Sequence, residues 1–256
     1  MPPKLAKKKP AKSEARKPSI KKSAAKKRAL APDLPKHKPA KRDLNPERIH
    51  SILSILRESY PDAECALVHA NTWQLLVATI LSAQCTDARV NMVTPKLFAT
   101  YPTPKAMGDA PLEALEALIR TTGFYHNKAK SIQGAGRVIS QQFNGEVPQT
   151  MAELLNVPGA ARKTANVVLG VAYGKAEGIV VDTHVFRLAR RLGLTRGETP
   201  QIVEQDLMKI IPKNRWIQFS HELIHHGRQI CDARKPKCAA CPLETLCQSP
   251  DKTWSS

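Results

Sequence analysis

Four cysteines near the C-terminal end of this 256-residue chain constrain its fold more than any other feature. They follow the spacing Cys-x6-Cys-x2-Cys-x5-Cys, so four thiols fall within 17 residues. Both tetrahedral zinc and an iron–sulfur cubane accept four thiolates. The spacing differs from the two Cys-x2-Cys pairs usual for zinc, which weakly favours iron–sulfur. The predicted metal ligands are Cys231, Cys238, Cys241 and Cys247.

The other two cysteines, Cys65 and Cys85, stand alone among apolar residues and are interpreted as buried thiols. The N-terminus has no apolar run of the kind a secretory signal needs. No stretch approaches the roughly 20 apolar residues of a membrane-spanning helix. We therefore expect no membrane association and a reducing compartment, in which clustered cysteines act as ligands rather than as disulfides.

The basic charge is concentrated at the start of the chain. The formal net charge is +18, from 40 Lys and Arg against 22 Asp and Glu. The first 42 residues hold 16 of the basic residues and two acids, a net +14 that leaves +4 for the rest. Residues 1–43 have few large apolar side chains, so we expect a disordered tail. We interpret it as a polyanion-binding arm, with a solubilising or targeting tail as the alternative.

Apolar residues recur at helical spacing through most of the remaining chain. Asn45 suits a helix N-cap and Pro46 the first helical position. Gly178–Val181 is the only short β-like run, so the predicted fold is all-α. Further helices are expected over Thr72–Leu81, Leu112–Ile119, Lys128–Phe143, Gln201–Ile211 and Trp216–Ile230.

Residues 154–166 are predicted to form a helix, a tight turn and a second helix. Pro158-Gly159 breaks the chain, and the apolar pattern resumes from Thr164 to Tyr173. A turn that leads into a helix N-terminus exposes unpaired amides, which suit a phosphate. Lys163 lies in the first turn of the second helix, where an uncharged amine could attack a sugar carbon and form a Schiff base. The local sequence alone favours the alternative, a solvated or phosphate-binding lysine.

Asp182 ends the apolar run at Val181 and precedes a segment that is helical in character. One interpretation is an N-cap, a position that favours Asp. The other is a carboxylate that stabilises positive charge on a sugar ring or accepts a proton. The two are compatible, because capping would fix the position of the carboxylate.

Five segments occur together in a distinctive order. They are Leu81–Gln84, Gly145–Pro148, Val157–Asn166, Val181–His184 and the four cysteines. Each is moderately specific by itself, and their ordered occurrence is very specific. In these segments the chain, over roughly residues 44–250, resembles the endonuclease III family of helix-hairpin-helix DNA glycosylases.

The resemblance implies two helical lobes with DNA across the cleft between them. One lobe is a six-helix barrel over residues 65–176 that contains the helix-hairpin-helix. The second joins residues 44–64 to residues 177–256 and holds a 4Fe–4S cluster on the four cysteines of the C-terminal loop.

The resemblance also implies an activity, that of a bifunctional DNA glycosylase and AP lyase of base excision repair. Lys163 matches the nucleophile of the family, and Asp182 matches its catalytic aspartate. The expected partner is double-stranded DNA that contains oxidised pyrimidines or abasic sites, bound by a monomer. The enzyme would act in the cytoplasm on the nucleoid if bacterial, and in the nucleus if eukaryotic.

The residues that the resemblance assigns to DNA binding include two departures from the family pattern. Phe124 stands where the family usually has a leucine wedge, so the preference for the opposite base is expected to differ. Ala161 stands where the hairpin usually has glycine, and a positive φ there would cost roughly 1 kcal/mol. We expect weaker DNA binding or an altered substrate range from this alanine. The assigned residues are Gln84, Phe124, Gly159, Ala161 and Arg162.

Two alternatives remain open at the level of sequence. The first is a monofunctional glycosylase of the same fold, although such relatives lack a lysine at the hairpin position that Lys163 occupies. The second is a non-catalytic DNA-binding protein with a structural zinc, which would make Lys163 and Asp182 coincidental.

Overall fold

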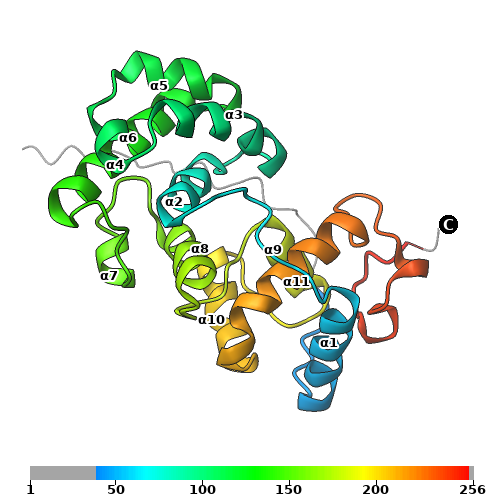
Figure 1. The fold of residues 1–256 in the computed structure, drawn as a ribbon. Coiled ribbons are helices and arrows are strands. Elements are labelled where there is room, and N and C mark those ends of the chain that lie inside the picture. Colours follow the sequence, from blue (N-terminus) through cyan, green and yellow to red (C-terminus); the bar gives the residue numbers. More distant parts are fainter. Residues whose placement is uncertain (1–38, 254–256) are drawn as a thin grey trace, which may run out of the picture. The chain divides into compact units, whose positions relative to one another are not determined.

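The computed structural model describes residues 39–253, and these residues form helices joined by loops, with no β-strand among them. The predicted all-α class is therefore confirmed. The basic tail lies mostly outside the described residues. The helices are α1 (Pro46–Ser59), α2 (Thr72–Leu81), α3 (Asp87–Thr100), α4 (Pro104–Asp109), α5 (Leu112–Ile119), α6 (Tyr125–Gln142), α7 (Met151–Leu154), α8 (Arg162–Tyr173), α9 (Thr183–Arg191), α10 (Pro200–Ile210) and α11 (Trp216–Gln229) (Figure 1).

Side-chain caps define where most of these helices begin. Asn45 accepts a hydrogen bond from the backbone N–H of Glu47, and Asn71 accepts one from that of Gln74. Such caps satisfy amides that the first helical turn leaves without partners. The same arrangement starts four other helices, at Thr86, Thr103, Thr150 and Thr199.

One hydrophobic core surrounds α2. Every residue of this helix from Leu75 to Leu81 is buried, because other helices cover all of its faces. The core extends from Leu67 to Leu169 in sequence, and α2 packs against α3, α6 and α8. Helix α8, which carries the predicted nucleophile, is thus held directly on the most buried helix of this core.

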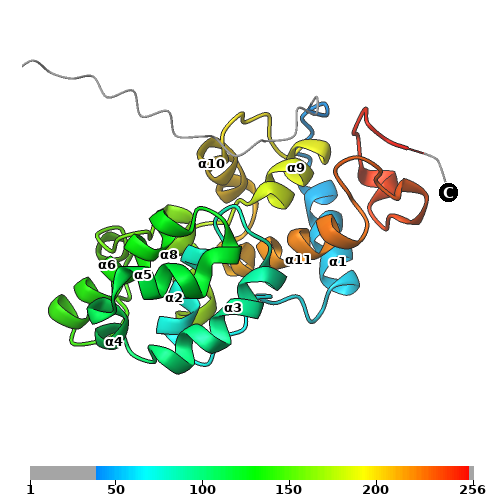
Figure 2. The same cartoon turned by 90° about the horizontal axis from the view of Figure 1, so that it is seen from above.

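A second hydrophobic core joins the two ends of the described chain. Helix α1 packs on α11, which also packs on α9, and the three helices lie side by side in both views (Figures 1 and 2). Buried residues between Ile49 and Ala63 contact residues between Ile179 and Leu243. The two cores draw on different parts of the sequence, and the predicted domain boundaries stay a prediction.

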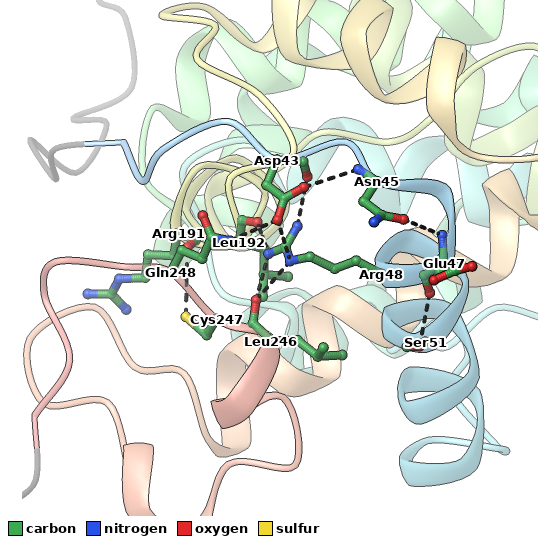
Figure 3. A network of polar contacts seen from close by, with 10 residues as sticks. All are labelled: Asp43, Asn45, Glu47, Arg48, Ser51, Arg191, Leu192, Leu246, Cys247 and Gln248. Atoms are coloured by element: carbon green, nitrogen blue, oxygen red, sulfur yellow. Dashed lines mark hydrogen bonds and ion pairs between the residues drawn. The ribbon is translucent and has the colours of Figure 1, made fainter.

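Arg48 fastens the N-terminal segment to the cysteine-rich end. Its guanidinium donates hydrogen bonds to the backbone oxygens of Asp43, Leu192 and Leu246, at 2.6–3.1 Å (Figure 3). Gln248 adds a contact, because its side-chain amide donates to the Asp43 carboxylate at 2.8 Å. Three segments distant in sequence therefore meet at one arginine.

The β-like run at Gly178–Val181 forms no strand, in agreement with the predicted all-α fold. The run has no partner strand among residues 39–253, and the Val180 N–H instead donates to the hydroxyl of Ser220 at 3.1 Å. Ile179 and Val181 are buried in the second core. The apolar run thus packs as an extended loop. Among residues 39–253, no helix is long and apolar enough to cross a membrane.

Candidate active site and cysteine cluster

The predicted hairpin is present between α7 and α8. Gly159 has a φ of +82°, which the sharp turn requires and which L side chains rarely adopt. A Cβ atom on Gly159 would also lie 2.8 Å from the Cβ of Ser131. Both the backbone conformation and the close packing therefore demand glycine at this position.

Ala161 adopts an ordinary extended conformation, with a φ of −79°. The strain considered for this alanine requires a positive φ, so that part of the prediction is wrong. The left-handed residue of the turn is Gly159, two positions earlier. The only remaining ground for an effect of Ala161 on DNA binding is its methyl group, which faces solvent because the residue is exposed.

Helix α8 begins without a side-chain cap. Ala161 is its N-cap residue and supplies no hydrogen bond to the first turn. The amides of that turn carry the positive end of the helix dipole, and their free N–H groups form an anion site. Lys163 lies exposed in the same turn. The start of α8 therefore combines a phosphate-sized donor site with a primary amine.

Arg162 is held by an acidic side chain from another helix. Its Nε lies 2.9 Å from Oε2 of Glu204 on α10, and Nδ2 of Asn166 donates to Oε1 of the same carboxylate at 2.8 Å. Glu204 is buried, and a Cβ atom on Gly178 would come 2.1 Å from its Oε1. This network anchors the first two turns of α8, including the turn that carries Lys163.

Asp182 is the N-cap of α9, as one of its two interpretations predicted. Its Oδ1 accepts hydrogen bonds from the backbone N–H groups of His184 and Val185, both at 2.8 Å. These bonds fix the carboxylate group, and no hydrogen bond to Oδ2 is recorded within residues 39–253. Capping thus leaves one carboxylate oxygen available for chemistry.

The structure brings Lys163 and Asp182 together on one pocket. The pocket is lined by residues from both cores. An adjoining pocket is lined by the same two residues and by Gln84. An amine and a carboxylate on one pocket form a site that can hold a group and act on the atom beside it.

Sequence reasoning missed four charged or titratable residues that line this pocket. Asp87, the first residue of α3, makes an ion pair with Arg228 near the end of α11. Burial lowers the pKa of His221, and the neighbouring His225 and Arg228 lower it further, whereas Glu64 opposes the shift. These residues come from segments far apart in the chain, so no local motif indicates them. The four are Glu64, Asp87, His221 and Arg228.

Gln84 and Phe124 are both exposed and both have a positive φ, of 52° and 49°. A positive φ is uncommon for residues other than glycine and is often found at functional positions. Phe124 has 61% of its surface exposed, which is unusual for a large aromatic side chain. Only one further non-glycine residue within 39–253, Asn144, shares this backbone conformation.

The four C-terminal cysteines line one cavity. Their surroundings supply N–H donors to sulfur, a feature of thiolates that bind iron–sulfur clusters. The backbone N–H of Thr253 lies 3.4 Å from Sγ of Cys238, and Nη1 of Arg191 lies 3.3 Å from Sγ of Cys231. Burial raises the pKa of the Cys241 thiol to about 11. Metal binding would therefore have to displace a proton there.

No three His, Cys, Asp or Glu side chains within residues 39–253 are placed to hold a single metal ion. Each thiolate of a cubane cluster binds a different iron atom, so its ligands surround a volume rather than a point. Four thiols around one cavity, with N–H groups directed at two of the sulfurs, fit such a group.

Comparison with known proteins gives one family. Residues 77–213 match the model of the HhH-GPD superfamily base excision DNA repair protein. The chain is 56% identical over 203 residues to endonuclease III of Synechocystis sp., covering 79% of this chain and 93% of that protein. It is 46% identical over 210 residues to endonuclease III of Bacillus subtilis, covering 82% and 95%.

A solved structure of an endonuclease III trapped as a covalent intermediate with DNA has the same fold. It superposes with a TM-score of 0.77 at 47% identity, covering 80% of this chain and 97% of that one. Identity, coverage and fold agree, and this chain belongs to the endonuclease III family of base excision DNA repair proteins.

Proposed function

We propose that Lys163 and Asp182 carry out the DNA glycosylase and AP lyase chemistry that this chain has as an endonuclease III. The observation that supports the proposal most is that both residues line one pocket although they lie on different helices. Lys163 is exposed for contact with DNA, and Asp182 is fixed by two backbone hydrogen bonds.

The steps follow from the chemistry of the two groups. A damaged nucleotide leaves the base stack at a cost of a few kcal/mol, which is lowest for damaged or mispaired bases. The Lys163 amine attacks C1′ and loses a proton, the bond from C1′ to the base breaks, and the base leaves with a proton. Asp182 stabilises the positive charge that develops on the sugar and handles protons. The C1′–O4′ bond then breaks and O4′ takes up a proton, which opens the sugar ring and leaves a Schiff base between C1′ and Lys163. The Schiff base acidifies the C2′ proton, and its removal drives β-elimination, in which the C3′–O bond breaks and the 3′ phosphate leaves.

The proposed substrates are oxidised or ring-saturated pyrimidines and abasic sites in double-stranded DNA. Glu64, Ser82 and His221 line the pocket and offer both hydrogen-bond donors and hydrogen-bond acceptors. Such groups suit the carbonyl and N–H edge of a pyrimidine. In this proposal Gln84 fills the gap left by the extruded base, and Phe124 is the wedge that separates its neighbours.

The hairpin is the proposed phosphate-binding element. The uncapped first turn of α8 would bind one phosphate of the strand through its amides. Gly159 allows the turn, and Ala161 lies beside the phosphate. Arg162 adds positive charge while its Nε stays bound to Glu204.

Cys231, Cys238, Cys241 and Cys247 would hold a 4Fe–4S cluster. When bound, the cluster supplies a cross-link for the loop rather than a bond-breaking step. The basic residues between the first two cysteines, Arg234, Lys235 and Lys237, are exposed, where they would offset the negative thiolates and could contact phosphates. The protein is proposed to act as a monomer, in the cytoplasm with the nucleoid, because the relatives named above are bacterial.

Borohydride trapping on DNA with an abasic site tests the catalytic proposal. The expected result is a covalent adduct with the wild-type protein and none with Lys163→Ala. Lys175→Ala is a matched control, because Lys175 follows the same helix and lies outside both pockets. An adduct that persists in Lys163→Ala would remove Lys163 from its role and favour a monofunctional enzyme or another nucleophile.

A further inference from the structure

A buried lysine lies directly behind the proposed wedge. Lys128, in the first turn of α6, is only 5% exposed. Within residues 39–253 it makes no ion pair, although a buried ammonium is costly to leave without a carboxylate partner. Burial accordingly lowers the pKa of Lys128. Neither the proposed chemistry nor the hydrophobic core accounts for a charged group at this position.

The side chain of Lys128 bonds to the loop before α6. Its Nζ donates a hydrogen bond to the backbone oxygen of Thr122 at 2.8 Å. Its backbone N–H makes the first helical hydrogen bond of α6, to the backbone oxygen of Phe124 at 3.1 Å, as any residue at this position would. The bond from Nζ to Thr122 is therefore the contact that is specific to lysine. Thr122 is itself buried, with its hydroxyl bound to the Ile119 oxygen at 2.8 Å.

The loop from Thr122 to Phe124 has a strained backbone conformation, which a hydrogen bond to Thr122 can stabilise. Gly123 and Phe124 both have a positive φ, of 71° and 49°. For phenylalanine this conformation is strained, and no side-chain cap stabilises the start of α6. Exposure of the ring adds a further cost, because the aromatic side chain gains nothing from burial. Without an external constraint, we expect the loop to relax and the ring to turn toward the protein.

We propose that Lys128 is a positioning residue that presets the Phe124 wedge before DNA binds, because its Nζ holds the backbone carbonyl group of Thr122, two residues before the wedge. The inference rests on the proposed function, because it assumes that Phe124 opens the duplex. It assigns Lys128 no contact with the reacting atoms. Its effect should therefore appear only where base pairs must be opened.

The test compares two substrates under single-turnover conditions with the holoenzyme. One is a duplex with an oxidised pyrimidine, which must be opened, and the other is a single strand with a preformed abasic site, which need not be. Lys128→Met removes the charge and the donor at nearly constant volume. We expect base excision from the duplex to fall about tenfold and cleavage of the single strand to change less than about twofold. Lys130→Met is the matched control, because Lys130 is exposed on the same helix.

A double-mutant cycle with Phe124→Ala separates positioning from general stability. If Lys128 acts through Phe124, Lys128→Met has no further effect once the ring is absent, and Lys128→Arg, which keeps cation and donor, retains activity on the duplex. Independent effects of the two substitutions, or equal losses on both substrates, would overturn the inference. Lys128→Gln, which keeps an N–H donor on a shorter stem, gives the same comparison if Lys128→Met does not fold.

The two proposals fail in different ways. If the wild-type protein does not cleave the single-stranded abasic site, the assignment of Lys163 fails whatever Lys128 does. If the wild type cleaves both substrates and Lys128→Met matches it on the duplex, only the inference about Lys128 is wrong.

Discussion

Asp182 and Arg191 lie at the two ends of the same helix, α9, and each end serves a different site. At the start, Oδ1 of Asp182 caps the helix and its carboxylate borders the pocket with Lys163. At the end, the Arg191 guanidinium reaches Sγ of Cys231 and the backbone oxygens of Asp232 and Ala233. A helix of nine residues thus connects the proposed catalytic carboxylate to the cysteine loop without an intervening hinge.

Substitutions of Asp182 can distinguish its role as a helix cap from its proposed catalytic role. Asp182→Asn keeps an oxygen that can accept from His184 and Val185, but it removes the charge. We expect the melting temperature to stay within a few degrees and the single-turnover excision rate to fall at least about a hundredfold. Asp182→Ala should lose the same activity and, in addition, about 1 kcal/mol of stability from the cap. An active Asp182→Asn enzyme would show that the carboxylate only caps the helix.

Arg191 is expected to matter for the cysteine loop more than for catalysis. It is 3% exposed, and its replacement by Ala removes a donor to Cys231 together with two donors to loop carbonyls. Purified Arg191→Ala should therefore contain less iron and sulfide per chain and unfold at a lower temperature. Arg196→Ala, an exposed arginine shortly after α9, provides the control for loss of charge. Equal iron content in both variants would contradict the assignment.

Local signals in the sequence predicted most helices but not the pocket. Thr72–Leu81 was predictable because a continuous apolar run follows Asn71, a good cap. Helix α6 begins at Tyr125, three residues earlier than predicted, because its N-cap, Phe124, uses a left-handed backbone that no sequence pattern indicates.

Tertiary packing accounts for the rest. Lys163 and Asp182 were assigned as site residues through the family resemblance, because the local sequence alone favoured a solvated lysine and allowed a helix cap. Glu64, Asp87 and His221 were not, because they meet only when α11 packs beside the start of α3. The Gly178–Val181 run is β-like in sequence, yet it forms a loop whose Ile179 and Val181 side chains pack in the second core.

His221 should make the protein less stable in mild acid. Burial, His225 and Arg228 hold its pKa below the usual 6.5, so the folded state resists protonation. The unfolded chain binds a proton as the pH falls through about 6.5, and stability is lost from there down to the lowered pKa of the folded state. His221→Gln removes this proton-binding difference. The melting temperature of the variant should therefore fall less than that of the wild type between about pH 7.5 and about pH 5.5. Parallel curves would contradict the prediction.

The hairpin offers a matched pair of glycine and alanine substitutions. Gly159→Ala forces an L residue into a φ of +82° and brings its methyl 2.8 Å from the Cβ of Ser131, so it should cost about 2–4 kcal/mol. Ala161→Gly changes a residue whose φ is −79° and should change the stability by less than about 1 kcal/mol. Thermal unfolding of both variants measures these costs, and titration with abasic-site DNA measures binding. Because the backbone at position 161 is unstrained, a gain in DNA affinity in Ala161→Gly would have to come from removal of the methyl group beside the phosphate. Unchanged affinity would show that this departure from the family pattern has no effect on binding.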